Sequence, residues 1–207
     1  MIGDRLLVED RHLKIAKKVV SEIAERGIIL LNGPSGVGKT ECADCLQELL
    51  SNKGKNSLVL SLDDFYLVHP TIRNLNRKKQ GIESVGLTEI DWDYLQRICD
   101  DFVKQKPIHF RRVHKYADIV EHNVCDTDTL DVLIIEGLYA GYLKKYGYNY
   151  FNIYLDGTVS QTYSFRKKRR KENPDDNFRK KVVQKEYKVI CQLKKYANLI
   201  IPFEGGL

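Results

Sequence analysis

Residues 33–40 have the types and spacing that point most directly to chemistry. They read Gly33-Pro34-Ser35-Gly36-Val37-Gly38-Lys39-Thr40 and match G-x-x-x-x-G-K-[ST] at every fixed position. Glycines let the backbone turn its N–H groups inward, and a helix that begins here adds positive potential for phosphates. In such a loop Lys39 reaches the β- and γ-phosphates and Thr40 ligates Mg²⁺. The motif therefore predicts a site for a nucleoside triphosphate with magnesium.

Carboxylates follow two other apolar runs of the chain. Asp63 and Asp64 come at the end of the run 57–62, and Glu136 closes the run 131–136. Because parallel strands end at one edge of their sheet, these groups should face the same crevice as the phosphate loop. There Asp63 could accept a proton from a hydroxyl, and Glu136 could hold Mg²⁺. The alternatives are a turn cap for the aspartates and a solvent-facing strand end for Glu136.

The elements that must position these residues follow from the hydrophobic pattern. Apolar blocks of strand length occur at 28–32, 57–62, 131–136, 151–155 and 198–201. Helices are expected after Asp10 and at 40–52, 91–105, 160–171 and 178–196. Strands separated by helices imply a parallel sheet with right-handed crossovers in one α/β domain over 1–207. We expect an irregular connection at 67–88 and a hairpin outside the main sheet at 108–124.

Five ordered motifs resemble those of uridine kinases and of the wider group that includes phosphoribulokinase and bacterial pantothenate kinase. After the phosphate loop come segments that match the family at 62–66, 90–93, 136–138 and 194–202. The resemblance runs from about residue 28 to 206. It implies a P-loop NTPase of the NMP-kinase-like, three-layer type, with a five-stranded parallel sheet, a small lid and a β-hairpin insertion. It also implies transfer of the γ-phosphate of ATP to a hydroxyl, with Asp63 as general base and Glu136 assisting the metal.

The ribose-binding segment of uridine kinases has no clear counterpart in this chain. The family usually carries D-H-P-D-A before the I-D segment, whereas residues 84–89 read S-V-G-L-T-E. Glu83 and Glu89 are open candidates for the missing carboxylate. The substrate-side insertion is expected at about 67–125.

The base-reading segment Y-D-F-V-x-H maps only in part, onto residues 117–122. Its candidate contact is His122, with a surface histidine as the alternative. Asp64 and Tyr66 are further candidate substrate contacts. The first expectation for the acceptor is a nucleoside such as uridine or cytidine. The alternatives are a sugar, polyol, pantothenate-like or hydroxy-acid acceptor, or a non-catalytic ATP-binding sensor or nucleic-acid regulator.

A basic stretch at 166–181 lies where the family has its lid. It holds nine Lys/Arg and three Asp/Glu, an excess equal to the net charge of +6 of the whole chain. Guanidinium groups bridge phosphate oxygens, so the resemblance implies that Arg166 and Arg169 act in catalysis and Arg170 in ATP binding. A solvated helix face is one alternative. Nucleic-acid binding is disfavoured because no aromatic residues interleave the run.

Composition excludes several other classes of protein. The chain has 207 residues, 43% hydrophobic and 30% charged, as expected of an ordinary soluble domain. No apolar run approaches the ~18 residues of a membrane span. The first residues are too charged for a signal peptide, and five irregularly spaced cysteines suit a reducing cytoplasm. We expect a cytoplasmic kinase that uses ATP and Mg²⁺ on a small-molecule hydroxyl, with a homodimer possible; the preference for ATP over GTP stays open.

Overall fold

The computed structural model describes residues 1–3, 6–23, 26–168 and 176–203. Its main sheet has five parallel strands in the order β2-β5-β1-β6-β7. Their bounds are β1 (Gly27–Asn32), β2 (Ser57–Ser61), β5 (Val132–Glu136), β6 (Tyr150–Leu155) and β7 (Leu199–Ile201). The continuous apolar runs form central strands that are buried on both faces, as parallel sheets require. The predicted five-stranded parallel sheet is confirmed.

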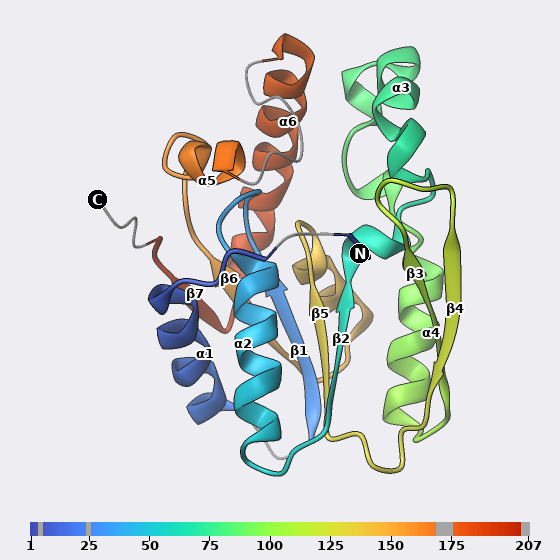
Figure 1. Ribbon diagram of the computed structural model, residues 1–207, viewed down its shortest axis with the longest axis vertical. Coiled ribbons are helices and arrows are strands. Elements are labelled where there is room, and N and C mark those ends of the chain that lie inside the picture. Colours follow the sequence, from blue (N-terminus) through green and yellow to red (C-terminus); the bar gives the residue numbers. More distant parts are fainter. Residues whose placement is uncertain (4–5, 24–25, 169–175, 204–207) are drawn as a thin grey trace.

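Helices cover both faces of this sheet and complete the three layers (Figure 1). They are α1 (Asp10–Glu22), α2 (Lys39–Ser51), α3 (Pro70–Gln80), α4 (Trp92–Val103), α5 (Tyr163–Lys168) and α6 (Asn177–Leu193). Alternate residues of β1 serve opposite cores: Ile29 packs with the side that α1 and α2 cover, and Leu30 with the side that α4 and α6 cover. Short 3₁₀ helices occur at Leu62–Phe65, Ile82–Ser84, Leu87–Glu89, Ala140–Tyr146 and Lys194–Tyr196.

The predicted hairpin forms a separate two-stranded sheet. Strands β3 (Ile108–Val113) and β4 (Val120–Cys125) pair antiparallel, with Ile108 opposite Cys125. The hairpin lies beside α4, at the edge of the molecule next to β2 (Figure 1). The prediction of a hairpin outside the main sheet is confirmed.

The expectation of an irregular connection at 67–88 is wrong, because α3 occupies its centre. Pro70 begins the helix, and the side chain of His69 caps it by accepting a hydrogen bond from Thr71 N. Gly81 ends it at a φ of +85°. Arg77 is the one buried residue of this helix, so no apolar stripe marked it in the sequence. Among the described residues, no helix is long and apolar enough to cross a membrane.

Candidate active site

A cavity of about 1190 Å³ opens at the carboxyl edge of the main sheet. β1 leads into the phosphate loop, β2 into the turn that carries Asp63, and β5 ends at Glu136. Lys39, Thr40, Asp63 and Glu136 all line the cavity, together with residues of α3, α5 and α6. The sheet topology thus gathers side chains that are far apart in the sequence, as open α/β sheets do at this edge.

The phosphate loop has the backbone geometry that the motif predicts. Gly36 and Gly38 adopt φ values of +83° and +100°, a left-handed conformation that favours glycine. Gly38 is also the N-cap of α2, and it brings no side chain to occupy the N–H groups that open the helix. Buried Lys39 donates from Nζ to the carbonyl of Pro34 at 2.8 Å. The loop therefore presents N–H groups, a helix N-terminus and an ammonium group to one side of the cavity.

Glu136 and Thr40 supply neighbouring oxygen atoms beside this loop. Glu136 accepts a hydrogen bond from Ser61 Oγ at 2.7 Å, and its other oxygen lies 3.4 Å from Thr40 Oγ1. Burial raises the pKa of the Glu136 carboxyl, while the Lys39 charge and the Ser61 hydrogen bond oppose that rise. Hard oxygen donors fit Mg²⁺. The described residues hold no cluster of three acidic, histidine or cysteine ligands, so phosphate oxygens and water would complete such a site.

The two neighbouring aspartates lie in different surroundings. Asp63 is half-buried and lines the cavity. Asp64 is buried: its carboxylate accepts the N–H of Val113 at 3.0 Å and lies 3.5 Å from Arg112 Nη1 and 3.4 Å from the Met1 amine. It is absent from the cavity wall. This group ties the hairpin to the turn after β2, and its expected contact with substrate has no support from this position.

Of the other candidate acceptor contacts, one lines the cavity and three do not. Tyr66 is buried and lines the cavity. His122 is exposed on β4, opposite Arg111, and does not line the cavity, a position that fits the alternative of a surface histidine. Glu83 pairs with Lys185, and Glu89 pairs with Arg77; neither glutamate lines the cavity.

Arg166 of α5 packs directly over the phosphate loop. A Cβ atom placed on Gly36 would lie 2.7 Å from Arg166 Cγ. The guanidinium donates to Thr162 Oγ1 at 2.6 Å and to the Val159 carbonyl at 3.1 Å. Burial, with the nearby Arg179 charge, lowers the pKa of Arg166. Arg169 and Arg170, the other arginines expected in the lid, lie outside the described residues.

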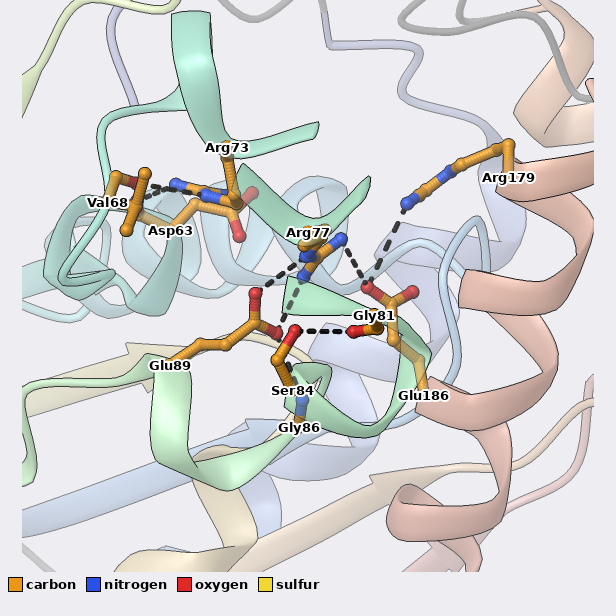
Figure 2. Close-up of polar contacts among 10 residues, drawn as sticks. All are labelled: Asp63, Val68, Arg73, Arg77, Gly81, Ser84, Gly86, Glu89, Arg179 and Glu186. Atoms are coloured by element: carbon orange, nitrogen blue, oxygen red, sulfur yellow. Dashed lines mark hydrogen bonds and ion pairs between the residues drawn. The ribbon is translucent and has the colours of Figure 1, made fainter. Parts of the chain in front are cut away.

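An arginine and glutamate cluster that was not predicted from the sequence joins α3 to α6 (Figure 2). Arg77 donates to both oxygens of Glu89, at 2.6 and 2.8 Å. One oxygen of Glu186 lies 3.3 Å from Arg77 and 3.8 Å from Arg179. Arg73, one turn before Arg77, also lines the cavity. The two arginines are spaced i, i+4, a signal that would have counted only if 67–88 had been recognised as helical.

Comparison with known proteins agrees with this geometry. Two of the curated relatives that match are kinases by name. The bifunctional alpha-galactosidase/sucrose kinase AgaSK of Mediterraneibacter gnavus is 26% identical over 206 residues, which cover 94% of this chain and 22% of that protein. The uridine kinase of Ureaplasma parvum serovar 3 is 28% identical over 118 residues, or 56% of this chain and 54% of that protein. The chain thus spans about a fifth and about half of the lengths of these two relatives.

A solved structure shares the fold. The putative fructose transport system kinase from Silicibacter sp. TM1040 superposes with a TM-score of 0.67 at 18% identity, covering 92% of this chain and 98% of that chain. The family model described as "Phosphoribulokinase / Uridine kinase family" matches residues 28–203, which is most of the sequence. Phosphate loop, sheet order and family match agree, and the chain belongs to the phosphoribulokinase/uridine kinase family of P-loop kinases.

Proposed function

We propose that this protein transfers the γ-phosphoryl group of ATP to a hydroxyl of a small molecule, with Mg²⁺. The observation that supports this most directly is that Lys39, Thr40, Asp63 and Glu136 line one cavity. The first two belong to the phosphate loop, and the last two are carboxylates from different strand ends. A site with a triphosphate cradle and a carboxylate facing it is suited to phosphoryl transfer.

In the proposed reaction, the N–H groups of the phosphate loop and Lys39 bind the β- and γ-phosphates. Asp63 accepts the proton of the acceptor hydroxyl while the oxygen of that hydroxyl attacks the γ-phosphorus. The bond from that phosphorus to the bridging oxygen breaks and ADP leaves. Thr40 and Glu136 would hold Mg²⁺, which neutralises phosphate charge when bound. Arg166, with Arg169 and Arg170 of a lid at about 166–181, stabilises the charge of the transferring group.

For the acceptor, we propose a non-nucleoside hydroxyl compound, and a uridine- or cytidine-like nucleoside is the competing prediction. Two observations favour the first. His122, the candidate base contact, and Glu83 and Glu89, the open candidates for the ribose-binding carboxylate, do not line the cavity. In addition, the relative that matches nearly the whole chain carries a sucrose kinase name, whereas the uridine kinase matches about half.

A panel of hydroxyl compounds tests both the activity and the acceptor. ADP release is measured with ATP and Mg²⁺ in the presence of nucleosides, sugars, polyols, hydroxy acids and vitamin precursors. Release with a non-nucleoside, well above the rate with uridine or cytidine, is expected. A protein that binds ATP tightly but phosphorylates no member would instead indicate a non-catalytic nucleotide sensor.

The layout of the chain is part of this proposal. One domain over residues 1–207 carries a lid at about 166–181 and an acceptor-side insertion at about 67–125. α3 and the β3–β4 hairpin belong to that insertion. A cytoplasmic location and a homodimer stay predictions.

A further inference from the structure

Arg73 is held in a fixed position at the acceptor side of the cavity. It comes from α3, and Tyr66, Asp63 and Asn74 line the cavity beside it. Its Nε donates to the Val68 carbonyl at 3.1 Å and its Nη2 to the Asp63 carbonyl at 3.5 Å (Figure 2). The guanidinium also stacks on the Tyr66 ring, 3.6 Å from the ring centroid. Three contacts thus fix both the place and the plane of this cation.

These contacts leave the far end of the guanidinium available. A guanidinium has five N–H donors, and the two hydrogen bonds of Arg73 use one on Nε and one on Nη2. Within the part of the chain that the structure describes, both donors of Nη1 and the second donor of Nη2 make no hydrogen bond. One donor from each terminal nitrogen is the fork that binds two oxygens of a carboxylate or a phosphate.

The groups around the Arg73 charge differ from those around Arg77, one turn further along the helix. Arg77 lies between the carboxylates of Glu89 and Glu186. Arg73 contacts backbone carbonyls and an aromatic ring, and no carboxylate of the described residues pairs with it. A half-buried, immobilised cation next to the proposed base is therefore electrostatically suited to an anion from solution.

The contacts of Arg73 connect it to the turn of the proposed base rather than to the phosphate loop. Its three contacts are all within residues 63–68, the turn that carries Asp63, and none is with the phosphate loop. In Figure 1, α3 and α5 lie on opposite sides of α6. We infer that the acceptor carries an anionic group, a carboxylate or a phosphate, close to its reacting hydroxyl, and that Arg73 binds that group. This inference rests on the proposed kinase activity for the identity of the second ligand.

Equilibrium binding tests it without turnover. A non-hydrolysable ATP analogue with Mg²⁺ saturates the phosphate loop, so an added anion cannot bind there and be mistaken for a ligand of Arg73. Titration calorimetry then compares glycerol, glycerate and glycerol 3-phosphate, and ribitol, ribonate and ribitol 5-phosphate. The variants are Arg73→Gln, Arg73→Lys and the control Lys79→Gln, which removes one charge from an exposed position of the same helix. Thermal unfolding checks that each variant is folded.

We expect at least one anionic form to bind about 10-fold or more tightly than its neutral counterpart, since a hydrogen bond to a charged group contributes in this range. Arg73→Gln removes that preference, Arg73→Lys retains part of it, and Lys79→Gln leaves it intact. The stronger of the carboxylate and phosphate arms identifies the group. Equal binding of neutral and anionic forms, no binding of any anion, or a preference that survives Arg73→Gln would overturn the inference. A protein that shows the preference but transfers no phosphoryl group would support it and contradict the proposed kinase activity.

Discussion

Glu136 combines two opposing demands on one carboxylate. It is 3% exposed, and burial raises its pKa because the charged form loses its hydration. The same group lies against Thr40 and Ser61, where we propose that its oxygen binds Mg²⁺. A buried carboxylate that is useful for function therefore costs stability when the site holds no cation.

Replacing Glu136 with Gln should stabilise the ligand-free protein, and more so at higher pH. The raised pKa means that the folded state holds this proton more tightly than the unfolded chain. The wild-type protein therefore loses stability as pH rises from the ordinary carboxylate range through the raised pKa of Glu136. The amide of the Gln variant does not titrate, so the variant has no such loss. Thermal unfolding without ligands at about pH 5 and about pH 8 measures the difference. An equal difference at both pH values would contradict the explanation.

At the scale of elements, α5 and the phosphate loop are packed so closely that the loop tolerates no side chain at Gly36. A Cβ atom there would lie 2.7 Å from Arg166 Cγ and 3.1 Å from the Thr162 carbonyl, in addition to the positive φ of the residue. Gly54 shares a positive φ, +72°, but a Cβ atom there would meet open space. A comparison of substitutions at Gly36 and Gly54 therefore separates the effect of backbone strain from that of the contact with α5.

Gly36→Ala is expected to weaken ATP binding about 10-fold or more, since the loop and α5 cannot both keep their positions. Gly54→Ala should cost about 1 kcal/mol of stability through strain and leave ATP affinity unchanged. Calorimetric titration with an ATP analogue, alongside urea unfolding, measures both effects. Equal ATP affinities in the two variants would show that the contact with α5 does not shape the loop.

The Arg77 cluster joins two elements that the sequence separates widely. Arg77 of α3 bridges Glu89, which follows that helix, and Glu186 of α6. Arg77 and Glu186 are each 3% exposed, so the opposite charges of the cluster must compensate one another. The cluster thus fastens the polar helix α3 against α6, where an apolar stripe would do so in an ordinary helix.

Arg77→Met should destabilise the protein by about 3 kcal/mol or more, because it removes the cation that Glu89 and Glu186 share. Lys79→Met, at an exposed position of the same helix, is the matched control and should change the free energy of unfolding by under about 0.5 kcal/mol. Urea unfolding at neutral pH measures both. Similar losses for the two variants would mean that the cluster does not anchor α3.

Across the whole molecule, the central strands could be predicted from the sequence and α3 could not, for physical reasons. Strands such as β1 and β5 are buried on both faces, so their continuous apolar runs stood out. α3 is held by ion pairs and caps, which leave no apolar period; only Pro70 and Gly81 marked its ends. The hydrophobic pattern did not distinguish Asp63 from Asp64, and only the family resemblance gave them different roles. The surroundings of each side chain are set by the 3₁₀ turn and by a hairpin about 50 residues away.

The proposed phosphoryl transfer depends on one cavity in which a carboxylate would face the triphosphate. Asp63 lines that cavity, while its neighbour Asp64 is turned into the hairpin. The two residues form a natural matched pair: both lose one negative charge on change to Asn, and only one is expected to touch the reaction. Asp64→Asn should reduce stability and keep transfer activity in the folded protein.

The most direct measurement compares Asp63→Asn with Asp64→Asn, using the best acceptor of the hydroxyl panel. Turnover and the affinity for a non-hydrolysable ATP analogue are measured on each. The proposed mechanism predicts that Asp63→Asn lowers kcat by about 1000-fold and leaves ATP affinity within about threefold, since general-base catalysis contributes in this range. Wild-type turnover in Asp63→Asn, or an equal fall of kcat in folded Asp64→Asn, would contradict it.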